Sequence, residues 1–303
     1  MSFTGVSLGC GNFGGVGSSP EFFGQGIAHD DAFAIMDRAW DAGIRWFDTA
    51  DAYGGGVSES WIGEWMRATG NRPVLTTKVF HSTVGNSDDT GLAPARIRRQ
   101  IEASMTRLGV DRVDLYLAHE PDDRVALAET IAAFESLRLQ GLIGAWGLSN
   151  YDAEGLAEAL HHGQPALVQN SFSLLERGDE RAVLPRCRGE RVNYVPFGPL
   201  AGGWLTGKYK RGEQFPAGSR MTQRPGPYER YVDDAVFDGL EALQVEADVR
   251  GVEMAALAFA WTLARCDGAV CGPGRAAHLD PIVSALAIDL SDDDVERIGG
   301  MFP

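Results

Sequence analysis

The sequence lacks the features that mark several large classes of protein. Its four cysteines, Cys10, Cys187, Cys266 and Cys271, form no Cys-x-x-Cys pair and no Cys/His cluster. Their spacing therefore predicts neither a zinc site nor a disulfide framework, and we expect no bound metal and reduced thiols. Residues 1–5 show no basic region followed by an apolar run, so no secretory signal is indicated and a cytoplasmic location is expected.

Long apolar runs and an excess of positive charge are also missing. The most apolar stretch, residues 255–264, is too short to cross a bilayer and is predicted to be a buried helix. The 303 residues include 42 acidic side chains and 27 lysines and arginines, which gives a formal net charge of −15. This balance argues against non-specific binding to nucleic acid or to anionic membranes, so we expect neither as a partner.

What the chain does have is a regular alternation of short apolar runs and longer helical patterns. Apolar residues at i, i+3 and i+4, with glycine at or just beyond the end, predict helices between the runs. The clearest of these helices cover residues 30–42, 57–68, 95–108 and 126–139. The runs that are typical of strands cover residues 6–8, 45–48, 74–79, 113–118, 143–148, 166–169, 193–197 and 269–271.

Strands that alternate with helices imply parallel pairing through right-handed crossovers. Eight such units in 303 residues predict an α/β fold of the (β/α)8 TIM barrel type, as a single domain over residues 1–303. The alternative is an open doubly wound sheet. It is disfavoured because the glycine-rich residues 8–15 lack the Gly-x-Gly-x-x-Gly spacing and do not open a helix. The long interval 198–268, with its polar segment 212–231, predicts a binding loop over the barrel.

Four polar residues stand at the ends of three successive predicted strands. Asp48 and Tyr53 follow the second, Lys78 ends the third and His119 ends the fourth. Barrel active sites form at these carboxyl ends, so we expect the side chains to converge. A lysine ammonium lowers the pKa of a nearby tyrosine, a carboxylate orients the lysine, and an imidazole can donate a hydrogen bond. Carbonyl reduction needs such a set, because the developing alkoxide must receive a proton. Each residue alone has an ordinary structural explanation, and it is their coincidence that favours chemistry.

At these residues the chain resembles the aldo-keto reductase superfamily over essentially its whole length. The resemblance includes Phe-Asp-Thr-Ala-Asp-Ala-Tyr-Gly at 47–54 and Gly-Leu-Ser-Asn at 147–150, with further matches at 76–78, 114–122, 168–170 and 199–209. It implies an NAD(P)-dependent oxidoreductase that transfers a hydride between a nicotinamide cofactor and an aldehyde, a ketone or the corresponding alcohol. In such an enzyme Tyr53 would donate the proton, Lys78 and Asp48 would tune it, and His119 would orient the carbonyl.

The resemblance also assigns cofactor positions. Ser149, Asn150 and Gln169 would hold the carboxamide of the nicotinamide, since an amide needs both donors and acceptors to fix its orientation. Phe197 stands where a tyrosine commonly stacks on the nicotinamide ring, and Gly198 stands where a serine is common. The other positions assigned to the nicotinamide and pyrophosphate are Gly11, Asn12, Phe13, Asp48, Pro199, Leu200, Gly202 and Lys208.

The adenosine end departs from the family pattern. Gly272, Gly274, Arg275 and His278 occupy the segment that follows the eighth strand, whereas Pro and Ile at 281–282 replace a Glu-Asn pair that holds adenine in the family. Arg275 offers a fork that matches a 2′-phosphate, which favours NADP (NADPH) over NAD, although NAD remains possible. The alternative is that this segment is simply a turn that leads into a helix.

The substrate would contact Tyr53, Phe80, His119 and Glu120. A carboxylate at Glu120 can accept hydrogen bonds from hydroxyls, which favours a sugar, a polyol or another polar carbonyl compound; alternatively, Glu120 faces solvent or forms a salt bridge. Two further functions stay open: a cofactor-binding regulatory subunit of the potassium-channel β type with little turnover, and a barrel lyase or isomerase without nicotinamide. Oligomeric state and reaction direction cannot be read from these residues.

Overall fold

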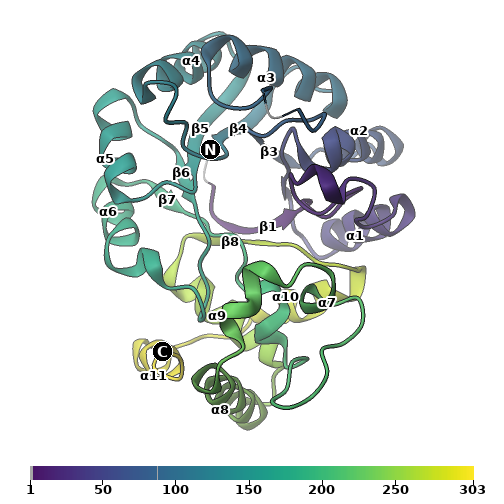
Figure 1. The fold of residues 1–303 in the computed structure, drawn as a ribbon, viewed down its shortest axis with the longest axis vertical. Helices are drawn as coiled ribbons and strands as arrows, with labels where there is room; N and C mark the ends of the chain where they lie inside the picture. Colours follow the sequence, from purple (N-terminus) through teal and green to yellow (C-terminus); the bar gives the residue numbers. More distant parts are fainter. Residues whose placement is uncertain (1–2, 87) are drawn as a thin grey trace.

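The strands of the protein form one parallel sheet that curves into a nearly closed barrel (Figure 1). The structure is a computed structural model, and it describes residues 3–86 and 88–303. The strand order is β7-β6-β5-β4-β3-β2-β1-β8. The strands are β1 (Gly5–Gly9), β2 (Trp46–Asp48), β3 (Val74–Val79), β4 (Val113–Ala118), β5 (Ile143–Ser149), β6 (Leu167–Gln169), β7 (Asn193–Tyr194) and β8 (Gly268–Cys271).

The seam between β7 and β8 closes the barrel with few hydrogen bonds. β7 is two residues long, shorter than the predicted run, and the chain just after it approaches β8: the amide of Val270 donates to the carbonyl of Pro196 at 2.8 Å. The amide of Asp267 donates to the carbonyl of Tyr194 at 3.0 Å, and a parallel bridge joins Phe197 to Val270. The predicted (β/α)8 barrel is therefore confirmed, with its thinnest pairing at this seam.

Helices surround the barrel on the outside (Figure 1). Those predicted from the clearest patterns are α1 (His29–Asp41), α2 (Val57–Thr69), α3 (Pro94–Leu108) and α4 (Leu127–Leu139), each within one residue of the predicted ends. Proline at the first position of α3 and glycine after its last residue, Gly109 with φ of 70°, supply the usual start and stop signals. The remaining α-helices are α5 (Ala153–His162), α6 (Val183–Glu190), α7 (Arg220–Gln223), α8 (Asp234–Arg250), α9 (Met254–Arg265), α10 (Asp280–Ala285) and α11 (Asp292–Gly299).

Helix α9 contains the most apolar stretch of the sequence. Residues from Met254 to Thr262 in this helix are all buried, which confirms the prediction of a buried helix. In the described part of the chain no helix is both long and apolar enough to cross a membrane. The long interval that precedes α9 carries α7 and α8, and Figure 1 shows these helices in the lower part of the molecule, on the side of β8.

The barrel interior explains how an apolar core supports a polar site. Successive side chains of a strand point to opposite faces, so Trp46 and Asp48 share the inner face of β2, and Leu115, Leu117 and His119 share that of β4 and the residue after it. The lower inner positions are apolar and form one buried cluster with Phe3, Leu167, Val195 and Val270. Burial of each such leucine contributes about 1.5–3 kcal/mol. Trp46 in this layer donates from Nε1 to Thr76 Oγ1 at 2.7 Å, and the charged side chains of Asp48 and Lys78 lie above it, at the carboxyl ends of their strands.

Candidate active site

The four polar residues predicted to converge do meet at the carboxyl ends of β2, β3 and β4. The ammonium nitrogen of Lys78 donates to Asp48 Oδ1 at 2.5 Å and to the hydroxyl of Tyr53 at 3.3 Å. The same hydroxyl lies 3.5 Å from Nε2 of His119. Lys78 is only 1% exposed, and Asp48 2%. A buried charge needs a partner of opposite sign, and Lys78 and Asp48 are partners for each other.

A tight turn holds Tyr53 in this arrangement. Tyr53 begins a short 3-10 helix, η2 (Tyr53–Gly56), whose three glycines have φ values of 58°, 69° and 91°. Residues other than glycine rarely adopt backbone angles in this left-handed region. A Cβ atom at Gly54 would also lie 2.7 Å from the carbonyl oxygen of Phe13. The glycine run is therefore needed to bring the tyrosine back over the barrel mouth.

The electrostatic balance at Tyr53 differs from the one predicted from sequence. Loss of hydration raises the pKa of the Tyr53 phenol most strongly, Lys78 lowers it, and Asp48 raises it again. The net pKa lies above the ordinary value, so the expected lowering by Lys78 is present but is outweighed. Burial opposes the charged form of Lys78, whereas Asp48 and Tyr53 favour it, and the pKa of Lys78 ends above its usual value. At neutral pH the site holds a protonated tyrosine beside an ammonium.

His119 is held neutral. Burial, followed by the nearby Lys78 and His81, puts the pKa of His119 well below its usual value. Its Nδ1 atom is buried without a hydrogen-bond partner, and its Nε2 atom faces the hydroxyl of Tyr53. A neutral imidazole with its proton on Nε2 can donate to an oxygen placed next to Tyr53. The ring of His81 meets that of His119 edge-on, with 4.9 Å between centroids.

The predicted amide-binding trio stands beside these four residues. Gln169 donates from Nε2 to Asp48 Oδ2 at 2.9 Å, which leaves its own carbonyl oxygen for another donor. The side-chain amide of Asn150 donates to the backbone oxygen of His119 at 2.9 Å and to Ser149 Oγ at 3.3 Å. Asn150 has a φ of 62°, a left-handed conformation that asparagine tolerates better than most residues. The trio is therefore tied by hydrogen bonds to the Asp48 and His119 ends of the site.

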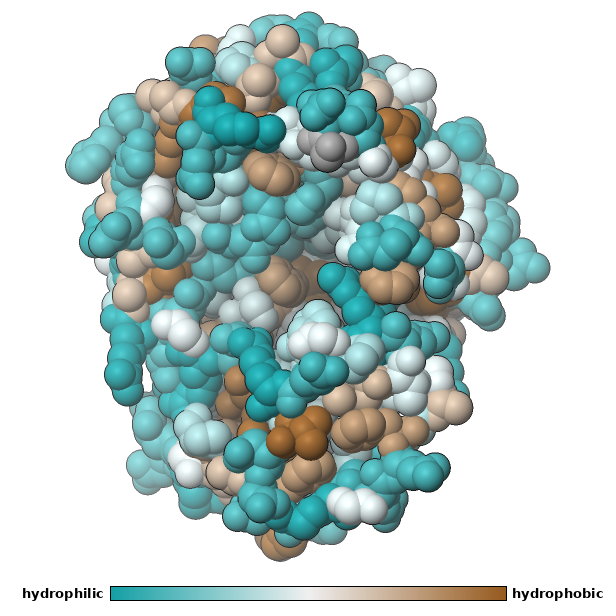
Figure 2. All heavy atoms as spheres, viewed as in Figure 1, coloured by the Kyte–Doolittle hydropathy of each residue, from teal (hydrophilic) through white to brown (hydrophobic). Residues whose placement is uncertain are grey.

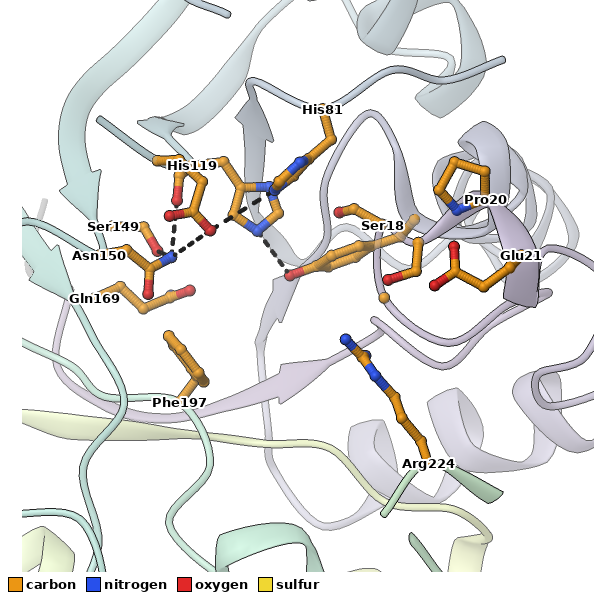
Figure 3. Close-up of a pocket in the computed structure, with 14 residues that line it drawn as sticks. Ser18, Pro20, Glu21, His81, His119, Ser149, Asn150, Gln169, Phe197 and Arg224 are labelled. Atoms are coloured by element: carbon orange, nitrogen blue, oxygen red, sulfur yellow. Dashed lines mark hydrogen bonds and ion pairs between the residues drawn. The ribbon is translucent and has the colours of Figure 1, made fainter. Parts of the chain in front are cut away.

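A cavity of about 440 Å³ opens above these side chains (Figure 3). Its volume falls in the range of small-molecule sites. Figure 2 shows this face of the molecule hollowed near its centre. Phe80, which was predicted to contact substrate, is not among the lining residues, whereas its neighbour His81 is. The lining residues are Gly17, Ser18, Ser19, Pro20, Glu21, Tyr53, His81, His119, Glu120, Ser149, Asn150, Gln169, Phe197 and Arg224.

A smaller cavity of about 160 Å³ adjoins the larger one, and Tyr53, Gly17 and Arg224 line both. Gly11 and Asn12, two of the predicted cofactor residues, lie on its wall, and Asn12 Oδ1 accepts a 2.5 Å hydrogen bond from Arg220.

Other predicted cofactor residues lie in the loop after β7 or in the core. Phe13 is completely buried, so its side chain belongs to the core. Gly198, Pro199, Leu200 and Gly202 lie in the loop after β7, where a Cβ atom at Gly202 would collide with the ring of Tyr228.

The predicted adenosine-binding residues gather on the surface after β8. His278 has a lowered pKa because of partial burial and then because of the positive charges of Arg275 and Lys208, so the three side chains are neighbours. Its Nδ1 atom accepts a 3.2 Å hydrogen bond from the amide of Gly274, in the turn that also contains Gly272. Neither Arg275 nor Lys208 forms an ion pair with any described residue. This donor set fits the phosphates of a dinucleotide, since each cation is free to bind an anion.

The described residues offer no candidate metal site. Among residues 3–86 and 88–303 no group of three or more His, Cys, Asp and Glu side chains is placed to hold a metal ion.

Comparison with known proteins identifies the class that this barrel and site define. Residues 6–301 match the Aldo/keto reductase family, and the chain belongs to that family. It is 34% identical over 300 residues to an uncharacterized oxidoreductase, YrpG, of Bacillus subtilis, with 93% of this chain and 90% of the relative covered. It is 30% identical over 292 residues to the aldo-keto reductase yakc [NADP(+)] of Schizosaccharomyces pombe, with 89% and 85% covered.

Two further comparisons concern enzymes with named reactions. The chain is 31% identical over 273 residues to the NADH-specific methylglyoxal reductase of Escherichia coli, with 85% of this chain and 83% of the relative covered. The structure of the glycerol dehydrogenase AKR11B4 from Gluconobacter oxydans superposes with a TM-score of 0.84 at 25% identity, over 98% of this chain and 90% of the other. The protein is therefore an NAD(P)H-dependent oxidoreductase that interconverts carbonyl compounds and alcohols.

One buried acid behind the site was not predicted as a functional residue. Asp51 is fully buried, and neither of its carboxylate oxygens has a hydrogen-bond partner. Burial and then the carboxylate of Glu59 raise the pKa of Asp51 well above its usual value, against the opposing pull of Arg96 and Arg107. No sequence signal distinguishes this residue, because an aspartate two positions before a tyrosine reads as part of a turn.

Asp51 should make the folded protein less stable as pH rises. Its raised pKa means that between the unfolded and folded pKa values only the folded state holds the proton, so stability falls as pH increases through this window. Asp51→Asn removes this titration, and we expect its melting temperature to vary less with pH, from about pH 4 upward. Thermal unfolding at pH values from 4 to 8 measures this. Parallel curves for the variant and the wild type would show that Asp51 is ionised in the folded state.

Proposed function

We propose that Tyr53, Lys78, Asp48 and His119 are the catalytic residues of this oxidoreductase. The observation that carries the proposal is the place of the Tyr53 hydroxyl, between the ammonium of Lys78 at 3.3 Å and Nε2 of His119 at 3.5 Å. The phenol is protonated at neutral pH, which suits a proton donor to a developing alkoxide. Neutral His119 orients the carbonyl oxygen by a hydrogen bond, and Asp48 keeps Lys78 charged and in place.

The cofactor is proposed to be NADPH in preference to NADH, and when bound it supplies the hydride. Ser149, Asn150 and Gln169 would hold the carboxamide, and Phe197, which lines the larger cavity, would pack on the nicotinamide ring. The fit rests on polar groups that are left unpaired in the structure: the carbonyl oxygen of Gln169, which can accept a hydrogen bond, and the cations of Lys208 and Arg275, which have no carboxylate partners. The two named relatives use NADP and NADH respectively, so the preference rests on this chain's own Arg275.

Arg275→Ala should weaken NADPH binding by about tenfold or more and leave NADH binding almost unchanged, because only NADPH carries the 2′-phosphate. Rising salt should shrink the difference, since the residue is exposed. Quenching of tryptophan fluorescence measures both dissociation constants. Arg67→Ala, which removes an exposed arginine from α2, is the matched control. Equal weakening of both cofactors would place Arg275 on the pyrophosphate, and no change in either would end its assignment.

The proposed substrates are small, polar carbonyl compounds such as sugars or polyol-derived aldehydes and ketones. Glu120 lies on the cavity wall, accepts a 3.2 Å hydrogen bond from Asn150 and lies 3.7 Å from His81. Its remaining acceptor sites and the ring of His81 can pair with substrate hydroxyls. Of the structurally and sequence-similar enzymes, one is named a glycerol dehydrogenase and one a methylglyoxal reductase, and both names refer to small polar compounds.

A screen of aldehydes and ketones with NADPH and with NADH tests this function. We expect turnover of polar aldehydes and quenching of tryptophan fluorescence by NADPH. Quenching without turnover of any carbonyl compound would favour the regulatory-subunit alternative, whereas absence of quenching would favour a barrel enzyme that needs no nicotinamide.

The whole chain, residues 1–303, is proposed to act as one domain in the cytoplasm. The support for this location is chemical: Cys10, Cys187, Cys266 and Cys271 are all free thiols in the structure. Thiols persist in reducing compartments.

A further inference from the structure

Arg224 stands on the wall of the larger cavity without a partner for its charge. It follows α7 directly, and Figure 3 shows its side chain reaching into the cavity toward the loop that carries Ser18. Its guanidinium forms no hydrogen bond or ion pair with any residue in 3–86 or 88–303, and its Cζ atom lies 5.6 Å from the ring centroid of Phe22. The guanidinium is partly buried, and none of its five N–H donors has an acceptor among the described residues. A ligand with acceptor oxygens can supply the missing partners.

The acids of the cavity wall do not neutralise Arg224. Glu120 is engaged by Asn150 and His81, and Glu21 is exposed and forms no ion pair with Arg224. By contrast, Arg220, one helical turn earlier, donates a hydrogen bond to the side-chain oxygen of Asn12. In a chain with a net charge of −15, Arg224 is thus a cation at the cavity that is left available to an anionic ligand.

The position of Arg224 relative to the reacting group decides what it could bind. Arg224 and Tyr53 line both cavities, and Arg224 lines the larger one together with Ser18, Ser19 and Glu21 of the loop after β1. The residues proposed to hold the nicotinamide, Ser149, Asn150, Gln169 and Phe197, form another part of the wall of the larger cavity (Figure 3). The cations proposed for the cofactor phosphates are Lys208, in the long segment after β7, and Arg275, after β8, and both lie near His278.

We propose that Arg224 binds an anionic group, a carboxylate or a phosphate, carried by the carbonyl substrate. The guanidinium fork matches both groups with paired hydrogen bonds. Together with Glu120 and His81, which suit hydroxyls, Arg224 defines the substrate class as hydroxylated aldehydes or ketones with an acidic end. This inference rests on the proposed function, because it names the substrate of the same site. The pyrophosphate of the cofactor has the same chemistry as such a group, so the test must separate the two sources.

The kinetic test compares Arg224→Gln with wild type on glyceraldehyde and glyceraldehyde 3-phosphate at saturating NADPH. We expect the KM of the variant for the phosphorylated aldehyde to rise about tenfold or more, since a charge-assisted pair is lost, and the KM for glyceraldehyde to change less than about twofold. Arg224→Lys should retain part of the discrimination. Arg67→Gln, an equal change of charge on an exposed face of α2, should behave as wild type.

A binding test separates this inference from the function itself. Calorimetric titration of succinate into the NADPH-bound protein should show binding that Arg224→Gln weakens about tenfold, whether or not any aldehyde is turned over. NADPH affinity, from fluorescence quenching, should stay unchanged. A raised dissociation constant for NADPH would assign Arg224 to the cofactor phosphates and overturn the proposal. Equal effects on both aldehydes, or unchanged succinate binding, would overturn it too, whereas absence of all turnover with succinate binding intact would count only against the enzymatic function.

Discussion

Tyr53→Phe should nearly abolish carbonyl reduction while it preserves fold and cofactor binding. The substitution removes one hydroxyl group, and the ring that packs beside Gly11 and His119 remains. A placed proton donor contributes about 10²–10⁴-fold to rate, so kcat for an unactivated ketone should fall by that factor. Steady-state kinetics at saturating NADPH measure the loss, and NADPH quenching with a thermal melt confirms that the protein is otherwise intact.

The matched control for Tyr53→Phe is Tyr151→Phe. Tyr151 is also a buried tyrosine whose backbone oxygen accepts from Asn170, but its side chain does not line either cavity. Its kcat should stay close to that of wild type. A Tyr53→Phe enzyme with full kcat would remove Tyr53 from the role of acid and would direct attention to His119 as the proton source.

Lys78→Met should have two separate effects, one on chemistry and one on stability. Alcohol oxidation needs Tyr53 as phenolate, and loss of the adjacent cation removes the influence that lowers the pKa of Tyr53. The pH at which oxidation becomes fast should therefore rise beyond that of wild type. Removal of the ammonium also leaves the buried Asp48 carboxylate without its 2.5 Å partner, which costs about 3–5 kcal/mol of stability. A pH–rate profile and a denaturant titration measure the two effects.

The double variant Asp48→Asn/Lys78→Met separates the two effects of Lys78. It removes both charges, so most of the lost stability should return, because no buried charge is left unpaired. The pH–rate profile of oxidation should remain displaced but less than in Lys78→Met, because loss of Asp48 removes an influence that raises the pKa of Tyr53 and that is smaller than the influence of Lys78. A profile that returned with stability would show that Lys78 acts only through the fold.

The sequence predicted the barrel and the convergence at Tyr53 because both depend on simple periodicities. Period-two alternation puts Asp48 above Trp46 and His119 above Leu117, and the carboxyl ends of parallel strands meet at one rim. The distance between Lys78 and Tyr53 then follows from strand neighbours, with the glycines of η2 returning the tyrosine to the rim. These are the parts of the site that regular elements position.

Loop residues and energetic balances were not predictable in the same way. His81 lines the cavity where Phe80 was expected, because the chain leaves β3 at Val79 and alternation no longer determines which side chain points inward. Arg224 is far from the strands in sequence, and only the path of the loop after β7 brings it to the cavity. The raised pKa of Tyr53 depends on how much water the surrounding residues exclude, which neighbours in sequence do not reveal.

In the proposed binding mode the cofactor would bridge the sparsely hydrogen-bonded seam between β7 and β8 and so stabilise the barrel. Phe197, proposed to pack on the nicotinamide, lies just after β7 and forms a bridge with Val270 of β8. Arg275, proposed to bind the 2′-phosphate, follows β8. A dinucleotide held at both places would span the joint that Val270 and Asp267 close with single backbone hydrogen bonds. Local opening of the seam would then require release of the ligand, so the binding free energy of the ligand would add to the stability of the seam. In the proposed binding mode the cofactor would therefore add a link between the two strands that share the fewest backbone hydrogen bonds.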